Sequence, residues 1–251
     1  MNNYKRGITT MRFWGYYLGE VFMKEKSAEA KVEELLVTGI LNGMYPAFSN
    51  LKPERELAME FGYSRPVVHK AIIRIESKGL LTIIPRQGVR VNDYRETGRL
   101  GLLESIYDLY HGGISTSLNQ SMLMFIQNNL EAMLVLILEG PAEKRHTCLQ
   151  IQRQVTFDKS LDVFTWLQNF AFCCENVIYP MLLNEFKSGI LNVSHAVLCH
   201  GNQMIFKEKM SDVTELLLDD FQLNREIIHQ KIQELFTFIE RNWLIEGENH
   251  E

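Results

Sequence analysis

Residues 53–91 read PERELAMEFGYSRPVVHKAIIRIESKGLLTIIPRQGVRV and place two short helical patterns and a β-hairpin pattern in direct succession. Pro53 suits the start of the first helix, because proline lacks the N–H that stays unpaired in a first turn. A Gly-Tyr pair then turns the chain, and Ser64 is a suitable N-cap for the second helix. Beyond Gly79, two β-branched runs flank Pro-Arg-Gln-Gly, which predicts a hairpin whose glycine has a positive φ.

The apolar residues of this stretch repeat at the spacing of buried helix faces. The expected buried positions of its two helices are Leu57, Ala58, Phe61, Val68, Ala71, Ile72 and Ile75. An earlier helix, from Ser27 to about Leu41, repeats this spacing at Val32, Leu35, Leu36 and Ile40. Three helices followed by a two-stranded wing make a winged helix-turn-helix, and we expect this fold for residues 23–96.

Charge is distributed unevenly along the chain, whose net charge is −5. Residues 23–98 contain 12 Lys and Arg against 10 Asp and Glu, whereas residues 99–251 contain 11 against 20. Residues 1–22 are slightly basic and rich in aromatics and glycine without a clear period, so we treat them as an N-terminal extension. A polyanion is therefore expected to bind the first hundred residues only, unless the asymmetry is ordinary surface variation.

From residue 97 onward the pattern is helical, so residues 97–251 are expected to form an all-helical antiparallel bundle that binds an effector and holds a dimer together. The last helix is predicted to begin at Ser211 and Asp212, a typical capped start. The longest strongly apolar run, AMLVLIL at 132–138, is too short to cross a bilayer, and the N-terminus lacks a signal pattern. We therefore expect a mainly α, cytoplasmic protein without a membrane partner.

Motifs for catalysis are missing from the sequence. It has no nucleophile–base signature, no phosphate-binding loop and no paired Cys or His motif, so we do not expect an enzyme or a cofactor. Four cysteines lack the spacing of a metal site and are expected to be reduced thiols: Cys148, Cys173, Cys174 and Cys199. His195 and His200 are five positions apart, which favours ordinary surface residues over metal ligands.

Several polar residues lie away from the apolar stripe of the third helix or on the hairpin: Arg65, His69, Arg74, Arg86, Gln87 and Arg90. A short helix of this kind fits the major groove of DNA. Positive side chains on the helix start and on the wing can contact phosphates, while the helix N-terminus reaches base edges. The sequence therefore predicts double-stranded DNA as a partner. The alternative is a module for protein contacts, with these arginines merely solvated.

Residues 51–91 closely resemble the DNA-binding domain of the GntR family of bacterial transcription regulators. The family form is Leu-Pro-Ser-Glu-Arg-Glu-Leu-Ala, then Gly-Val-Ser-Arg-x-x-Val-Arg-x-Ala-Leu, and a Gly-containing wing. The chain departs from it at Lys52, His69 and Pro85. His69 stands where an arginine is usual, and histidine cannot reproduce the bidentate contact of arginine with guanine. The resemblance therefore leaves the operator sequence open.

The resemblance also implies which residues contact DNA. The matching positions are Arg55, Ser64, Arg65, Pro66, Val67, His69, Pro85, Arg86 and Gln87. Ser64 and Arg65 keep the chemistry of the family, and Arg86 and Gln87 keep it only loosely. One winged module makes few base contacts and family members pair two, so we expect a homodimer on a pseudo-palindromic operator.

Two further segments, VNDYRETGRLGLLESIYDLYHGG at 91–113 and FAFCCENVIYPMLLNEF at 170–186, resemble the fatty-acid-responsive FadR subfamily. This resemblance implies a helical bundle whose effector, a long-chain acyl-CoA or fatty acid, changes the spacing of the two DNA-binding domains. Many relatives hold a metal through one Asp and three His. Here the matching positions are Val163, Leu167, the neighbourhood of Phe221 and Gln222, and His200. Only His200 keeps a ligand side chain, and one ligand does not make a site, so no metal is expected.

The resemblance matches four residues to effector positions, Phe125, Phe221, Asn224 and Ile228. Phe172 and Tyr179 of the apolar stripe complete the predicted effector site. An adaptable lining that would suit a long hydrocarbon is offered by Met122, Phe125, Met133, Leu134, Phe164, Phe170, Phe172, Tyr179 and Phe186. The same stripe is also the pattern of a plain helical core. A regulator that senses a small organic acid, or one whose pocket is filled, therefore remains an alternative.

Overall fold

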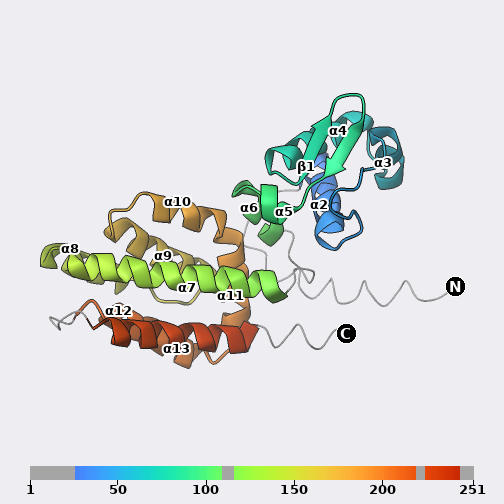
Figure 1. The fold of residues 1–251 in the computed structure, drawn as a ribbon. Coiled ribbons are helices and arrows are strands. Elements are labelled where there is room, and N and C mark those ends of the chain that lie inside the picture. Colours follow the sequence, from blue (N-terminus) through green and yellow to red (C-terminus); the bar gives the residue numbers. More distant parts are fainter. Residues whose placement is uncertain (1–25, 109–115, 219–223, 244–251) are drawn as a thin grey trace, which may run out of the picture.

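A computed structural model describes residues 26–108, 116–218 and 224–243, and Figure 1 shows a small domain beside a bundle of longer helices. The small domain consists of α2 (Ala28–Leu41), α3 (Glu54–Phe61), α4 (Arg65–Ser77), β1 (Leu81–Ile84) and β2 (Gly88–Val91). Three helices followed by a two-stranded antiparallel sheet confirm the predicted winged helix-turn-helix. The expected N-terminal extension, 1–22, lies outside the described residues.

The core of the small domain forms where α2 and α3 pack on α4. The predicted stripe of α4 is confirmed, since Val68, Ala71, Ile72 and Ile75 are fully buried. On α2 the prediction is wrong at Leu35, which is 46% exposed, because the helix turns Val37 toward the core instead. On α3, Leu57 and Ala58 are buried as expected. Phe61 is only half-buried against this core.

The wing pairs Leu81 with Val91 and Ile84 with Gly88, which leaves a three-residue tip. The Gln87 N–H donates to the Ile84 carbonyl over 3.0 Å, which closes the turn. Gly88 has a φ of 114°, as predicted, and Arg86 at the tip also has a positive φ of 65°. A proline followed by a residue at positive φ is typical of a type II turn, in which Gly or Asn usually holds the second place. The tip therefore forces an arginine into a backbone conformation that few side chains adopt.

The segment after the wing packs on the C-terminal end of α4. Gly79 has a φ of 84°, and a Cβ there would lie 2.0 Å from the carbonyl oxygen of Thr97, the last residue of α5 (Tyr94–Thr97). The Thr97 hydroxyl donates to the Gly79 carbonyl over 2.8 Å, and the Arg99 N–H donates to the Lys78 carbonyl over 3.0 Å. The linker between the two parts is thus fastened to α4.

The remainder of the described chain is helical, as predicted. Its elements are α6 (Gly101–Asp108), α7 (Thr116–Glu139), α8 (Ala142–Gln152), α9 (Ser160–Cys173), α10 (Ile178–Glu185), α11 (Lys187–His200), α12 (Gln203–Glu215) and α13 (Arg225–Trp243). The long α7 runs along the bundle and packs on α9 and α13, while α11 contacts α6, α9 and α13 (Figure 1). The first helix, α6, also touches α2 and so joins the bundle to the small domain.

The predicted start of the last helix is wrong. Ser211 lies inside α12, whose buried positions Phe206, Met210 and Val213 continue past it. The final helix, α13, begins after Asn224, whose side-chain oxygen accepts from the N–H groups of Glu226 and Ile227. A serine-aspartate pair is a good start signal, but the apolar stripe of α12 overrides it.

One described helix, Leu118–Glu139 in α7, is long and apolar enough to cross a membrane, with a mean hydropathy of 1.5. This helix extends well beyond the apolar run 132–138 at its centre. Leu130, Met133 and Leu134 of this helix are fully buried in the bundle. A core helix of a globular protein passes the same test, so this helix is weak support for a membrane span.

Candidate DNA-binding interface

The N-terminal end of α4 carries two predicted contact residues on one face, toward α3. Arg65 and His69 lie one turn apart and share the carboxylate of Glu54, the first residue of α3. The Arg65 Nε donates to Glu54 Oε2 over 3.2 Å, and His69 Nδ1 lies 2.7 Å from Glu54 Oε1. The Arg65 side chain is 72% exposed and that of His69 51% exposed. The structure therefore brings two of the predicted residues together on an accessible surface.

Burial of Glu54 acts to raise the pKa of its carboxyl, but hydrogen bonds from His69 and Arg65 outweigh it and leave the pKa lowered. Glu54 is thus a carboxylate at neutral pH and can only accept hydrogen bonds. Sequence reasoning passed over Glu54. The only signal for it was its place beside Arg55 in the Pro-Glu-Arg-Glu run, which does not reveal what the side chain contacts.

The three residues that begin α4 differ in accessibility. Ser64 is the N-cap residue of α4, as predicted, but its side chain makes no cap hydrogen bond and the residue is exposed. Pro66 is exposed in the first turn, and Val67 is half-buried. The start of α4 thus offers one hydroxyl and a small apolar surface beside Arg65.

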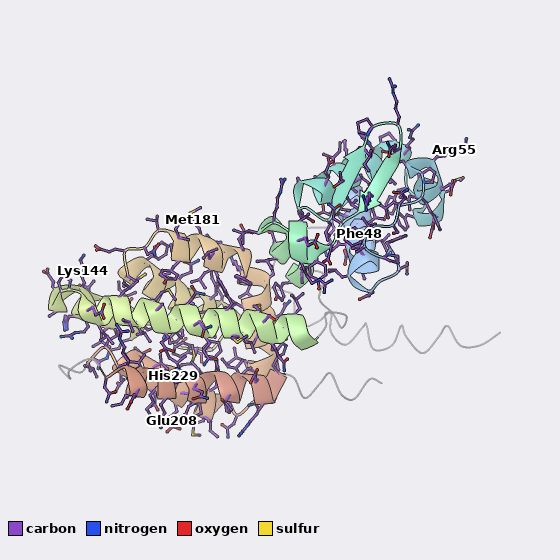
Figure 2. The ribbon with its side chains drawn as sticks, viewed as in Figure 1. Phe48, Arg55, Lys144, Met181, Glu208 and His229 are labelled. Carbon is purple, nitrogen blue, oxygen red and sulfur yellow. The ribbon has the colours of Figure 1, made fainter. Side chains whose placement is uncertain are left out.

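The other predicted contacts lie on the surface of α3 and the wing. Arg55 is exposed and lies on the side of α3 away from the bundle (Figure 2). Arg86 and Gln87 are exposed at the tip of the wing. Arg90, on β2, has its guanidinium 5.5 Å from the centre of the Phe48 ring, a distance at which a cation–π interaction stabilises both.

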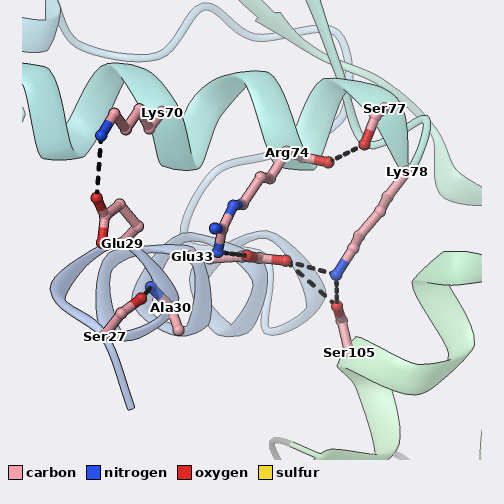
Figure 3. Close-up of polar contacts among 9 residues, drawn as sticks. All are labelled: Ser27, Glu29, Ala30, Glu33, Lys70, Arg74, Ser77, Lys78 and Ser105. Carbon is pink, nitrogen blue, oxygen red and sulfur yellow. Dashed lines mark hydrogen bonds and ion pairs between the residues drawn. The ribbon is translucent and has the colours of Figure 1, made fainter.

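Arg74 does not share the face of Arg65 and His69. It points toward α2, where its Nη1 lies 3.8 Å from Glu33 Oε2 (Figure 3). One turn further, Lys78 Nζ donates to Glu33 Oε1 over 2.5 Å and also to the hydroxyl of Ser105 on α6. Arg74 thus lies apart from the pair Arg65 and His69 and is drawn toward a glutamate on α2, although its side chain is 53% exposed.

The contacts among Glu33, Lys78 and Ser105 join three helices, and we name them the polar junction. Glu33 and Ser105 are each only 9% exposed. A buried charge is stable only when paired and hydrogen-bonded, so Lys78 is held in place between α2 and α6. The junction ties the helix that carries Arg65 and His69 to the first helix of the bundle.

The predicted effector residues lie in different surroundings. Phe172 is 68% exposed, whereas Ile228 is 3% exposed. Phe125 is 36% exposed, with its ring 5.0 Å from that of Phe186. Tyr179 is half-buried, Asn224 caps α13, and Phe221 lies outside the described residues. The described members of the set are thus divided between the surface and the core.

Six members of the predicted apolar lining belong to the core of the bundle: Met122, Met133, Leu134, Phe164, Phe170 and Phe186. Phe170 packs edge-on against Trp166, with ring centres 4.9 Å apart. A surface groove of about 310 Å³ lies elsewhere, lined by Lys209, Gln230, Gln233, Glu234, Thr237, Phe238 and Arg241. None of the predicted effector residues that the structure describes lines this groove.

Within the described ranges, no group of three or more Cys, His, Asp or Glu side chains could hold a metal. Val163 and Leu167, which stand where relatives carry metal ligands, are buried apolar residues of α9. The side chain of His200 and residues Phe221 and Gln222 lie outside the described part. The four cysteines are free thiols, of which Cys148 is buried.

Comparison with known proteins places residues 28–91 in a family described as bacterial regulatory proteins, gntR family. Fatty acid metabolism regulator proteins of Proteus mirabilis and of Yersinia pestis are each 29% identical to the chain over 171 residues, which is 66% of this chain and 70% of theirs. The solved structure of Lar, described as controlling expression of the Listeria monocytogenes agr system and mediating virulence, aligns with 91% of this chain at 20% identity, with a TM-score of 0.49.

The matched range coincides with the winged helix-turn-helix, from the start of α2 to the end of β2. It contains Arg65 and His69 on the accessible face of α4, the Glu54 carboxylate that both contact, and the exposed wing. A helical part follows it, and the similarity to the fatty acid metabolism regulators extends over two thirds of the chain. Residues 28–91, which form the winged helix-turn-helix, therefore belong to the gntR family of bacterial regulatory proteins.

Proposed function

We propose that the chain binds a pseudo-palindromic DNA operator as a homodimer, with α4 in the major groove and the wing on the adjacent backbone. The observation that carries this proposal is the accessible pair Arg65 and His69 at the N-terminal end of α4. In helix-turn-helix proteins this end of the recognition helix reaches base edges. Arg86 at the exposed tip of the wing supplies a charge for a phosphate, and phosphate contacts dominate affinity.

The DNA contacts of the proposal are Arg55, Ser64, Arg65, Pro66, Val67, His69, Arg86 and Gln87. Arg74 is left out because it pairs with Glu33. Two copies are needed because a single winged module makes too few base contacts for specificity in a genome. The protein would act in the bacterial cytoplasm, on the nucleoid.

The proposed effector is a long-chain acyl-CoA or fatty acid that binds the helical part and releases DNA. Support comes from the relatives of Proteus mirabilis and Yersinia pestis, which are named fatty acid metabolism regulators. Each buried methylene of an acyl chain contributes about 0.8 kcal/mol, so a long chain supplies enough free energy to shift a two-state dimer. The acyl chain must then open a space among core residues such as Met122 and Met133, whose flexible side chains adapt readily.

A second candidate is a regulator that works without an effector or senses a small organic acid. The packing of the bundle favours it, since Met133, Leu134 and Phe170 are fully buried in one continuous core. In this case the DNA-binding domains keep a fixed spacing and fatty acids leave DNA binding unchanged.

The test begins with selection of an operator from a random duplex library by the full chain. Fluorescence anisotropy at several salt concentrations then gives affinity, and sedimentation gives the number of chains per duplex. Oleoyl-CoA and oleate are titrated into the complex, with CoA and acetyl-CoA as controls that lack a long chain. Release by the long-chain ligands alone supports the proposal. Release by none of them favours the second candidate, and failure to enrich any sequence contradicts both.

A further inference from the structure

The contact between Glu54 and His69 determines which ring nitrogen carries the proton. Nδ1 lies 2.7 Å from Oε1 of Glu54, a hydrogen-bonding distance. Glu54 is ionised at neutral pH and has no proton to give, so Nδ1 must be the donor. The proton of the neutral ring is therefore on Nδ1, and Nε2 carries a lone pair.

The surroundings of His69 leave Nε2 for a partner outside the chain. Its side chain is 51% exposed, and Glu54 of α3 is the charged group that contacts its ring. Arg65, one turn earlier on α4, shares the same carboxylate through Nε. Among the residues that the structure describes, no other titratable group hydrogen-bonds or ion-pairs with this imidazole. Its hydrogen bonding outward is therefore determined by the ring and by Glu54.

The chemistry of Nε2 differs from that of the arginine usual at this position. An arginine only donates, and its typical partners in the major groove are O6 and N7 of guanine. A neutral ring with a lone pair on Nε2 accepts, and the donors in the major groove are the amino groups of cytosine N4 and adenine N6. A protonated ring has a hydrogen on Nε2 and becomes a donor again.

We propose that Glu54 is a specificity-determining positioning residue, which fixes His69 as the Nδ1–H tautomer so that Nε2 accepts a hydrogen bond from cytosine or adenine in the operator. This inference rests on the proposed function, because it assumes that α4 lies in the major groove. It adds a readout that an arginine at position 69 cannot provide.

The first test measures the tautomer in the free, full-length protein, without DNA. Long-range ¹H–¹⁵N NMR spectra at about pH 8, where an imidazole is neutral, should show the proton of His69 on Nδ1. Glu54→Gln removes the ionised acceptor and should give a mixture of both tautomers. Glu60→Gln is the matched control, since Glu60 is also on α3 but pairs with Lys52. A predominant Nε2–H form in the unaltered protein overturns the inference.

The second test repeats operator selection with the unaltered chain, Glu54→Gln, Glu60→Gln and His69→Arg. The unaltered chain and Glu60→Gln should prefer cytosine or adenine at one position of each half-site by about fivefold or more, near the lower limit for a mismatched base pair. His69→Arg should prefer guanine there, and Glu54→Gln should lose the preference while it keeps the rest of the operator.

The outcomes separate this inference from the function on which it rests. Enrichment of no sequence by the unaltered chain overturns the proposed function. An enriched operator whose bases are the same for the unaltered chain and for His69→Arg overturns the inference alone. Because His69→Arg leaves Glu54 in place, this comparison holds even if Glu54→Gln fails to fold.

Discussion

The two polar faces of α4 hold their charges in different ways. Toward α3, the Arg65 and His69 side chains are 72% and 51% exposed and share one carboxylate. Toward α2, the side chains of Lys78 and of its partner Glu33 are only 21% and 12% exposed. An exposed ion pair contributes about 0–1 kcal/mol to stability, whereas breaking a buried pair costs several times more. One face therefore keeps its polar atoms accessible, and the other fixes the helix between its neighbours.

The largest effect is expected when the accessible face loses its arginine. Arg65→Ala should lower operator affinity by about 1–3 kcal/mol per half-site, because it removes contacts to base edges. The thermal unfolding temperature should stay the same, since the side chain is mostly exposed. Arg225→Ala, which removes a similarly exposed arginine of α13, is the control and should leave affinity unchanged. Equal affinities of the two variants in anisotropy titrations contradict the proposed docking of α4.

The next largest effect is expected on the face of α4 toward α2, at the polar junction. Glu33→Ala should lower the free energy of unfolding by about 2 kcal/mol, less than for a fully buried pair because Lys78 is partly exposed. Urea unfolding followed by circular dichroism measures this loss. Glu29→Ala is the matched control, because Glu29 also joins α2 to α4 but pairs with the exposed Lys70. A loss for Glu29→Ala as large as that for Glu33→Ala argues against the special role of the polar junction.

A smaller effect is expected at the wing, where one substitution should raise stability and weaken DNA binding. Arg86 has a φ of 65°, which costs an ordinary side chain about 1 kcal/mol and asparagine less. Arg86→Asn should therefore raise the free energy of unfolding by about 0.5 kcal/mol. It should also weaken DNA binding, and the slope of log affinity against log salt concentration should fall by about 1, the effect of one lost phosphate contact. Arg90→Asn changes the same charge on a strand and should not stabilise the protein. A stability gain in both variants contradicts the explanation by positive φ.

The smallest effect is a pH dependence of stability that comes from Glu54. The pKa of this carboxyl is lowered in the folded protein, because hydrogen bonds from His69 and Arg65 outweigh the effect of burial. Its contribution to the free energy of unfolding is therefore complete at a pH above 4.5, the pKa of the carboxyl in the unfolded chain. This contribution is lost as the pH falls through the lower pKa of the folded protein. The stability difference between the unaltered chain and Glu54→Gln should shrink in acid. A difference that stays constant from about pH 7 to pH 3 rules this out.

Features that depend on neighbouring residues could be predicted from the sequence. The hairpin followed from two β-branched runs around Pro-Arg-Gln-Gly, and the buried face of α4 followed from the spacing of Val68, Ala71, Ile72 and Ile75. The helical nature of the second part followed in the same way. Errors occurred where two local signals competed, as at Ser211, where the continuous stripe of α12 overrode a start signal.

The sequence by itself determined the winged helix-turn-helix, its position in the chain and the arginine and histidine at the start of α4. Tertiary structure alone decided that Glu54 joins Arg65 to His69 and that Arg74 turns to Glu33. It also decided the polar junction, whose Glu33 and Ser105 are 72 positions apart. Periodicity and turn signals act over a few residues, whereas the choice of an ion-pair partner depends on which helices pack together. For this reason the sequence indicated the exposed polar residues at the start of α4, and only the fold revealed the carboxylate that they share.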